Sequence, residues 1–155
     1  MPDLRKSFFS ILEEMMAEDE KIIFITFDLG FSFAENLQSK FPERFINAGC
    51  IESAGVGIAA GLARGGLKPY LYSNAIFLLS RAHEFVRDDI AYNNTNVKLC
   101  GTGASGFLGF SHNIGENESE ENWLKGMPNI KSFYPKDEQE LKQALISDGC
   151  AYIRL

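Results

Sequence analysis

The sequence contains few of the residues that bind zinc or form disulfide frameworks. It has three cysteines, all far apart in the chain, and only two histidines, His83 and His112. No Cys-x-x-Cys pair occurs, whereas structural zinc sites and disulfide scaffolds need such residues in closely spaced sets. The composition therefore predicts reduced, mostly buried thiols in a cytoplasmic protein, with no metal site made by this chain alone.

Basic clusters and long apolar runs are also missing. Lys and Arg total 15 against 21 Asp and Glu, which gives a formal net charge of −6. A nucleic-acid-binding surface needs a basic patch to match the phosphate backbone. No apolar run approaches the roughly 20 residues that cross a bilayer, and the acidic N-terminal segment does not resemble a signal peptide. We therefore expect neither a nucleic-acid partner nor a membrane partner.

Apolar residues, 45% of the 155, are spread along the whole chain, which suits one domain with one core. Segments of strand character alternate with segments of helical periodicity. The strands are expected at 21–27, 44–49, 68–73, 96–100, 130–135 and 150–155, and the helices at 2–17, 31–41, 52–66, 76–92, 119–125 and 137–149. This alternation predicts a single α/β domain over 1–155, a three-layer sandwich with a mainly parallel sheet.

Polar residues follow three of the expected strands. Asp28 follows the first strand, Glu52 follows the second, and a glycine-rich loop with His112 follows the fourth. Ligands of parallel sheets usually bind beyond the carboxyl ends of the strands. We therefore expect these three groups to face one site.

The glycine-rich loop contains "GTGASG", from Gly101 to Gly106, which spells a dinucleotide-binding fingerprint. That fingerprint needs a helix opening on its last glycines and an acid about twenty residues further on. Here "FLGFSHNIGEN" follows, which has loop character. A nucleotide-binding α/β protein stays open as an alternative function, and a loop without nucleotide is the better interpretation.

Glu52 is the single acid at the start of a small, apolar segment, "NAGCIESAGVGIAAGLARGG". A carboxylate in the first turn of a helix is stabilised by the helix dipole by roughly 0.3–1 kcal/mol, which by itself would explain the residue. However, the same helix carries interior glycines, each costing roughly 1 kcal/mol relative to alanine. Such a helix gains from close approach to another backbone or to a ring, and a buried acid there needs a hydrogen-bonding partner. The residues alone leave both explanations open.

An ordered set of motifs resembles the pyrimidine-binding domain of transketolase and deoxyxylulose-phosphate synthase. It comprises "FDLGFS", "ERFINAGCIESAGVGIAAGLARGGLKPYLYS", "IFLLSRAHEFVRDDIAYNNTNVKL", "GFSHN", "MPNIKSFYPKDEQELKQAL" and "AYIRL". The resemblance spans nearly the whole chain. It is greatest for the carboxyl-terminal subunit of split, two-subunit transketolases.

The resemblance implies a thiamine diphosphate site. In the family, the glutamate at the position of Glu52 hydrogen-bonds the aminopyrimidine ring nitrogen N1′, and a protonated carboxyl favours the imino form of the ring. Phe77 matches an aromatic residue that packs on this ring, although it also fits a core phenylalanine. Asp28 matches an aspartate near the cofactor, and His112 matches a histidine facing the substrate. Arg81 matches an arginine that meets a sugar phosphate, but fits a surface ion pair equally well.

Other parts of the family pattern are missing. Gly103, Leu108 and Asn74 replace a histidine, an acid and an aromatic residue, which puts the usual substrate specificity in doubt. The G-D-G motif of the diphosphate-binding domain is absent from this sequence, and by the resemblance we expect that the chain also lacks the carboxyl-terminal domain of transketolase. The resemblance therefore implies a partner subunit that carries the diphosphate-binding domain and holds the diphosphate and Mg²⁺. It also implies a homodimer or heterotetramer.

The leading hypothesis is therefore the pyrimidine-binding half of a transketolase-like transferase. Such an enzyme moves two-carbon ketol units between sugar phosphates and is active only with its partner. The alternative, motivated by the missing residues, is a non-catalytic homologue with a role in assembly or regulation.

Overall fold

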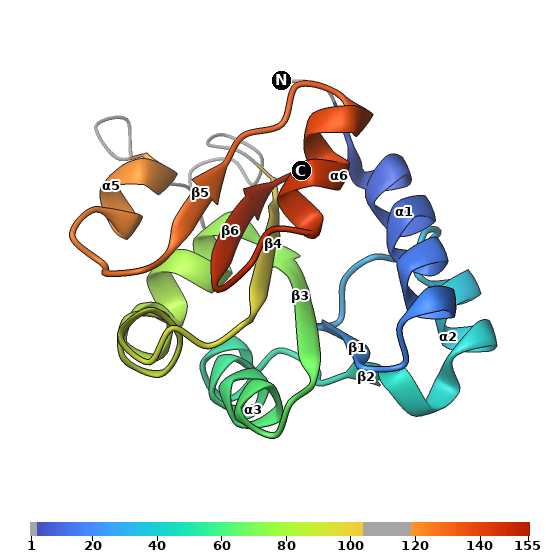
Figure 1. The fold of residues 1–155 in the computed structure, drawn as a ribbon, viewed down its shortest axis with the longest axis horizontal. Helices are drawn as coiled ribbons and strands as arrows, with labels where there is room; N and C mark the ends of the chain where they lie inside the picture. The colour runs from blue at the N-terminus through green and yellow to red at the C-terminus, as the bar shows by residue number, and fades with distance from the viewer. Residues whose placement is uncertain (1–2, 104–118) are drawn as a thin grey trace.

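Six strands form one sheet in the computed structural model of the protein, which describes residues 3–103 and 119–155. Every strand pair is parallel, and the strand order is β2-β1-β3-β4-β6-β5 (Figure 1). The predicted α/β architecture with a parallel sheet is confirmed. The strands are β1 Ile22–Thr26, β2 Phe45–Asn47, β3 Lys68–Asn74, β4 Lys98–Thr102, β5 Lys131–Phe133 and β6 Ala151–Arg154.

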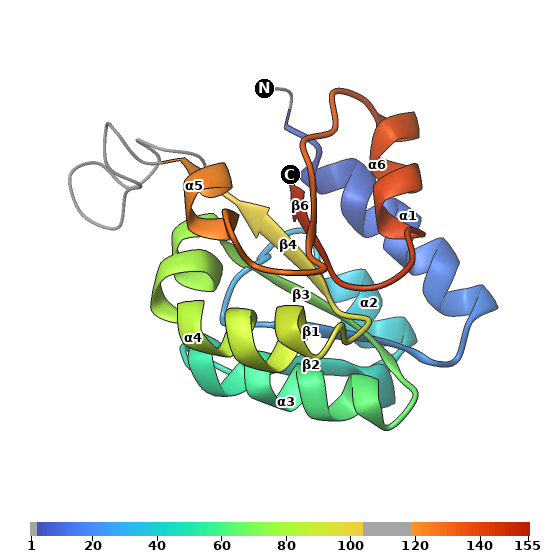
Figure 2. The ribbon, with the colours of Figure 1, turned by 60° about the vertical axis from the view of Figure 1, so that its left-hand side comes forward.

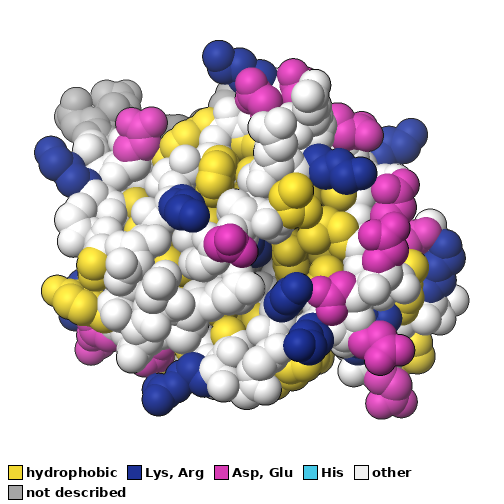
Figure 3. All heavy atoms as spheres, viewed as in Figure 1, with side chains coloured by type: hydrophobic (Ala, Val, Ile, Leu, Met, Phe, Trp, Pro, Cys, Tyr) yellow, Lys and Arg dark blue, Asp and Glu magenta, His cyan; other side chains and the backbone are white. Residues whose placement is uncertain are grey.

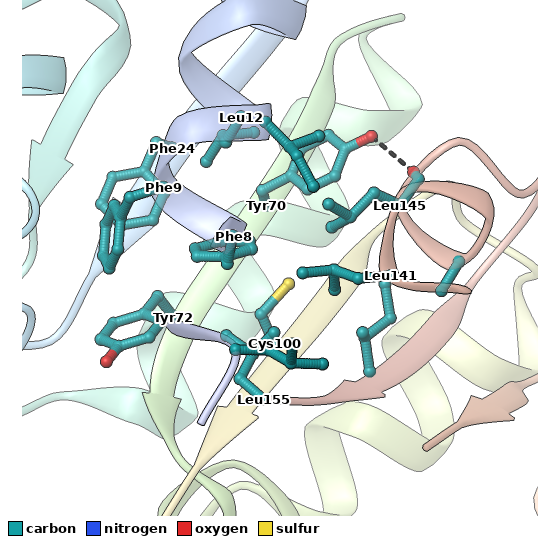
Figure 4. Packing of buried hydrophobic residues seen from close by; sticks show 14 of the residues in the cluster. Phe8, Phe9, Leu12, Phe24, Tyr70, Tyr72, Cys100, Leu141, Leu145 and Leu155 are labelled. Carbon is teal, nitrogen blue, oxygen red and sulfur yellow. Dashed lines mark hydrogen bonds between the residues drawn. The ribbon is translucent and has the colours of Figure 1, made fainter. Parts of the chain in front are cut away.

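Three helices cover one face of the sheet: α1 (Arg5–Glu18), α2 (Glu35–Lys40) and α6 (Glu138–Leu145). The core between them and the sheet is rich in aromatic rings, including Phe8 stacked on Tyr72 with 5.8 Å between centroids. Figure 4 shows these rings with the Tyr70 hydroxyl, which donates to the Leu145 carbonyl over 2.8 Å. That bond satisfies a buried hydroxyl and ties β3 to the end of α6.

The opposite face of the sheet is covered by α3 (Glu52–Arg64) and by the chain from residue 77 to residue 92. Figure 2 shows α3 beside the segment that contains α4, with strands of the sheet behind them. The short helix α5 (Glu120–Leu124) packs near the start of that segment. Two helical layers therefore enclose the sheet, as the predicted three-layer sandwich requires.

The expected continuous helix over 76–92 is wrong in detail. The chain forms a π-helix η2 (Phe77–Arg81), a short α4 (His83–Phe85) and a second π-helix η3 (Val86–Tyr92). Ala82 leaves helical geometry at φ −102° and ψ 17°. The Arg81 carbonyl accepts a hydrogen bond from the Ser53 hydroxyl over 2.8 Å. This contact from α3 supports the break, which the apolar periodicity of the sequence does not reveal.

Local signals marked three helix boundaries correctly, the start of α6 and the ends of α2 and α3. The expected starts at residues 2 and 31 and the expected end at residue 149 are wrong, because α1 begins at Arg5, α2 begins at Glu35 and α6 ends at Leu145. Asp137 caps α6, and its Oδ1 accepts the Glu140 N–H over 2.8 Å. The 3-10 turn η1 (Pro42–Arg44) begins at the proline that follows α2, and Gly66 at φ +92° follows the end of α3. These residue types favour helix ends because they cap free N–H groups or adopt conformations that a helix interior excludes.

Charged side chains of both signs cover the surface. Figure 3 shows basic side chains scattered over the face in view. None of the helices in the described part of the chain has the length and apolar character needed to span a membrane.

Candidate functional site at the start of helix α3

Glu52 is the first residue of α3, and its side chain turns inward to the carboxyl end of β3. The residue is 1% exposed, so its predicted burial is confirmed. Ser73 of β3 donates its hydroxyl hydrogen to Oε1 over 3.3 Å, and Arg81 Nη1 donates to Oε2 over 2.9 Å. Both carboxylate oxygens therefore have donors, which offsets the cost of taking the charge out of water.

Close packing between α3 and β1 holds this carboxylate in place. A Cβ atom on Gly55 would lie 2.1 Å from the ring of Phe27, which follows β1 and is buried. Upstream, the Asn47 side chain at the end of β2 accepts the Gly49 N–H over 3.1 Å, and Gly49 has φ +72°. The glycine at position 55 thus lets the first turn of α3 approach the sheet edge, and Glu52 comes with it.

The guanidinium of Arg81 lies between the carboxylate of Glu52 and the ring of Phe77. Its carbon Cζ is 4.1 Å from the centre of the Phe77 ring, while Nη1 donates to Glu52. A flat, delocalised cation is therefore stacked on an aromatic face and hydrogen-bonded at its edge to a buried carboxylate. The wide turn of η2 supplies both Phe77 and Arg81.

This ion pair is open to solvent on one side only. The Arg81 side chain is 42% exposed and that of Glu52 is 2% exposed. The resemblance implied the aminopyrimidine ring nitrogen as the hydrogen-bonding partner of this acid, and the structure shows two donors within the domain, Ser73 and Arg81. The sequence had left Arg81 between a phosphate contact and a surface ion pair. The ion pair is present, but it is made with a buried acid.

Asp28 lies at the same carboxyl edge of the sheet, one strand away. Its N–H donates to the Asn47 side chain over 3.0 Å, and the Asn47 amide reaches its carboxylate over 3.5 Å. Asp28 has φ +57°, a left-handed conformation that asparagine and aspartate tolerate better than most residues. The predicted cofactor-side aspartate is therefore exposed and held by β2.

His112 and Leu108 lie outside the described residues, so the expected convergence of His112 with Glu52 stays a prediction. The other histidine, His83, packs edge-on against Trp123 at 5.5 Å between ring centroids, and its Nδ1 lies 3.1 Å from the Leu79 carbonyl oxygen.

The first glycine of "GTGASG" has a packing role of its own. A Cβ atom on Gly101 would lie 2.4 Å from the hydroxyl oxygen of Tyr152, in the neighbouring strand β6. Gly101 therefore makes room for a buried tyrosine. Gly103 has φ +71°, which suits a loop immediately after β4. Both observations explain glycines of this motif without a nucleotide.

Sequence reasoning missed a second buried ion pair near the carboxyl end of β6. Arg154, the last residue of β6, donates to Glu120 at the start of α5, and both residues are buried. Burial raises the pKa of Glu120, an effect that the nearby Arg154 opposes. The Tyr152 hydroxyl and the Arg154 Nε are buried and have no hydrogen-bond partner among the residues that the structure describes. Arg154 stands in an apolar run, so only its tertiary position reveals the pair.

Ser73 was also missed, although its place as a small polar residue at the end of the third expected strand was an available signal. The residues that could hold an aminopyrimidine are Glu52, Ser73 and Phe77. In this structure the Arg81 guanidinium lies over the Phe77 ring. In the described part of the chain, no group of three or more His, Cys, Asp or Glu residues is placed to hold a metal ion.

Comparison with known families gives a consistent result. A family model described as the pyrimidine-binding domain of transketolase matches residues 1–148. An apulose-4-phosphate transketolase subunit of Phocaeicola vulgatus is 36% identical over 90% of this chain and 45% of its own length. A putative transketolase C-terminal section of Methanocaldococcus jannaschii is 32% identical over 98% of this chain and 50% of its own length.

Solved structures show the same relationship. A split-gene transketolase, described as an inactive β4 tetramer, superposes with a TM-score of 0.83 at 34% identity. The match covers 97% of this chain and 50% of that one. A transketolase of Campylobacter jejuni shares the fold with a TM-score of 0.80 at 24% identity. The chain thus spans half or less of the length of these relatives.

Proposed function

This chain belongs to the family of transketolase pyrimidine-binding domains, and on that basis we propose that it is the pyrimidine-binding half of a thiamine diphosphate-dependent enzyme. The enzyme transfers two-carbon ketol units between sugar phosphates. The active site forms only when the diphosphate-binding domain of a partner polypeptide docks on this chain. The substrates are proposed from the family and from the transketolase chains among its relatives.

The observation that carries this proposal is the placement of the Arg81 guanidinium. It is flat and delocalised, it stacks on Phe77, and its edge donates to buried Glu52. An aminopyrimidine ring is also flat, and makes the same two kinds of contact through its face and its N1′ edge. The space between Phe77 and Glu52 therefore fits the group that the family implies.

The roles of the side chains follow from this geometry. Ser73 donates to Oε1 of Glu52, and Arg81 donates to Oε2. Oε2 is therefore the oxygen that would bind the ring nitrogen once Arg81 has moved away. A protonated Oε2 would donate to N1′. The cofactor, when bound, supplies the carbon nucleophile of ketol transfer. Phe77 would orient the pyrimidine plane, and Arg81 would turn toward solvent.

The diphosphate and Mg²⁺ are assigned to the partner subunit. This chain has no G-D-G motif, and Mg²⁺ is usually held by carboxylates together with substrate phosphates. We propose Asp28 as a further cofactor contact and His112 as a substrate contact. A heterotetramer or a homodimer of the complete enzyme would place two such sites between subunits.

The test is reconstitution with a subunit that carries a G-D-G diphosphate-binding domain, thiamine diphosphate and Mg²⁺, followed by assay of ketose phosphate donors. Glu52→Gln keeps the shape of the side chain but removes its acid. We expect it to lower kcat by about 10²–10⁴-fold, the usual contribution of a positioned acid. Glu121→Gln, at an exposed position of α5, is the matched control and should leave kcat unchanged. Full activity of the Glu52→Gln complex would rule out the assigned role.

A second candidate is a non-catalytic assembly or regulatory subunit. It is favoured by the same ion pair, because Glu52 already has both oxygens satisfied inside its own domain. Asn74, where relatives have an aromatic residue, caps the following turn through its contact with the Ile76 N–H over 3.2 Å. This candidate predicts a complex whose formation is indifferent to thiamine diphosphate and which transfers no ketol unit.

A further inference from the structure

A cavity of about 270 Å³ lies at the amino edge of the sheet, opposite the carboxyl ends of the strands. The first residues of three neighbouring strands line it, Ile22 of β1, Lys68 of β3 and Lys98 of β4, together with Met15 and Leu145 near the ends of α1 and α6. Figure 3 shows hydrophobic side chains in a hollow to the right of the centre, with charged side chains at its border. Since one water takes about 30 Å³ in the liquid, the cavity has room for a small molecule. We call Met15, Ile22 and Leu145 its apolar floor.

Lys98 brings a buried positive charge to this cavity. The residue is 2% exposed, and its Nζ donates to the Asn96 side chain and to the Gly149 carbonyl, each over 2.6 Å. An ammonium group has three N–H donors, and the described residues accept from two of them. A buried charge without a counter-charge is costly, so a ligand that supplies a negative charge would offset that cost.

Ser147 brings a second donor to the same cavity. Its Oγ is buried and has no hydrogen-bond partner among the residues that the structure describes. Ser147 stands two residues before Gly149, whose carbonyl binds the Lys98 ammonium. An unsatisfied buried hydroxyl is itself unfavourable. A carboxylate has two oxygens, so it can accept from both the ammonium and the hydroxyl.

The negative groups that would repel an anion from this cavity already have donors. The Asp19 carboxylate, which follows α1, accepts from Lys68 Nζ over 2.7 Å, and the Asp19 carbonyl accepts from Arg44 over 2.9 Å. At the end of α6, the Leu145 carbonyl accepts from the Tyr70 hydroxyl over 2.8 Å. These bonds reduce the negative potential that the carboxyl ends of two helices would otherwise create.

We propose that this cavity binds a small monocarboxylate with a short apolar body. The carboxylate accepts hydrogen bonds from Lys98 and Ser147, and the body lies on the apolar floor. A single negative charge is specified because Glu18 and Asp148, both exposed at the border of the cavity, would repel a second one. The site lies at the sheet edge opposite Glu52 and goes beyond the proposed ketol transfer, on which it does not depend.

The experiment is titration of pentanoate into the full chain at pH 7, without cofactor, followed by NMR of ¹³C-labelled isoleucine and leucine methyl groups. The methyl groups of Ile22 and Leu145 should shift with a dissociation constant of roughly 0.1–1 mM, as for a ligand of few atoms. Ile58 of α3, on the other helical layer, is the internal control and should not shift. Pentanamide has the same chain without the charge, and should bind at least about tenfold more weakly.

Two variants test the donors. Lys98→Met keeps an unbranched side chain but removes the charge, and should raise the dissociation constant at least about tenfold. Ser147→Ala removes one neutral hydrogen bond and should raise it about threefold to tenfold. Lys131→Met is the matched control, because Lys131 is exposed and donates to the Asp148 carbonyl over 3.0 Å from the neighbouring strand β5. It should leave the dissociation constant unchanged.

The pH dependence tests the role of Lys98 without any substitution. Burial lowers the pKa of Lys98 to about 8, so the charged fraction falls about tenfold from pH 7 to pH 9. Pentanoate binds the charged form, and its affinity should therefore fall about tenfold over this range. Burial raises the pKa of Tyr70, Cys100 and Cys150, which keeps these groups largely neutral. The other charged groups around Lys98 are Glu18, Asp19, Lys68, Lys131 and Asp148.

Several results would overturn the proposal. They are the absence of methyl shifts at the apolar floor, equal binding of pentanamide or of inorganic phosphate, and an affinity that does not change between pH 7 and pH 9. Unchanged binding by Lys98→Met or Ser147→Ala, or equal weakening by Lys131→Met, would also do so. Because binding is measured without turnover or thiamine diphosphate, each result is independent of whether ketol transfer is observed.

Discussion

Two buried glutamates of this domain each bind an arginine, but the two pairs differ in how they meet solvent. In the Glu120–Arg154 pair, both side chains are enclosed, at 10% and 4% exposure. In the Glu52–Arg81 pair, the acid is even more enclosed, at 2% exposure, while the arginine side chain is 42% exposed. The first pair joins the end of β6 to α5, and the second joins the start of α3 to η2.

The difference separates a fixed contact from an exchangeable one. An enclosed charge that loses its partner stays in a medium of low dielectric constant, and that cost holds the partner in place. A half-exposed arginine can return to water at much lower cost, because an ion pair at the surface contributes little to stability. Arg81 can therefore give up its place on Glu52 to another hydrogen-bonding group, whereas Arg154 is fixed on Glu120.

The largest expected effect comes from breaking the enclosed pair. Arg154→Met should lower the free energy of unfolding by about 3–5 kcal/mol, because Glu120 would be left buried without its cation. Urea denaturation at pH 7 measures this loss. The double variant with Glu120→Leu should recover most of it, since a buried ion pair can be replaced by apolar residues at little cost. If the Arg154→Met variant is as stable as the unmodified chain, water reaches Glu120 when Arg154 is removed, and the Glu120–Arg154 pair is not enclosed.

A third buried charge, Lys98 of β4, extends the comparison to a cation whose hydrogen-bond partners in the described part of the chain are neutral. Its Nζ donates to the Asn96 side chain and the Gly149 carbonyl, each over 2.6 Å. Burial lowers the pKa of Lys98 from 10.5 to about 8. Below about pH 8 both the folded and the unfolded chain bind this proton, so the folded state carries the full desolvation cost. Between about pH 8 and pH 10.5 the unfolded chain binds more protons, so this contribution to stability rises with pH.

The prediction of intermediate size therefore concerns how the free energy of unfolding depends on pH. Arginine keeps its charge throughout this range, so the difference in unfolding free energy between the unmodified chain and Lys98→Arg isolates the lysine titration. From about pH 8 to about pH 10 that difference should change by about 2 kcal/mol in favour of the unmodified chain. Taking the difference cancels titration of Cys100 and the tyrosines. A difference that does not vary with pH would mean that Lys98 titrates as it does in the unfolded chain.

The smallest effect on stability is expected at the Glu52–Arg81 pair, whose arginine is partly exposed to solvent. Arg81→Met should change the free energy of unfolding by less than about 1 kcal/mol, because water can reach the side of Glu52 that Arg81 leaves. In a reconstituted complex the same variant should lower the half-saturating concentration of thiamine diphosphate, since the group that competes for Glu52 is gone. Arg87→Met, which removes an exposed ion pair with Asp88, is the control. Weaker cofactor binding in Arg81→Met would show that Arg81 contacts the cofactor complex instead of competing with it.

Much of the fold could be predicted because the signals were local. Continuous apolar runs marked the buried parallel strands, and residues such as Asp137, Pro42 and Gly66 marked helix boundaries through their backbone chemistry. The small apolar residues around Glu52 left an acid stabilised by the helix dipole and a buried acid both open, and the family resemblance favoured the buried one. The π-helical turns of η2 and η3 could not be predicted, because the Ser53 contact at the break comes from a helix distant in sequence.

By itself, the sequence determined the order of strands and helices, the family of the chain and the place of one acid at the head of α3. Only the tertiary structure decided which donors meet that acid, that Arg154 is enclosed with Glu120, and which glycine of α3 lies against the core. The physical reason is that periodicity and capping depend on neighbours along the chain. The stability and availability of a buried charge depend on the side chains and the water that surround it in space.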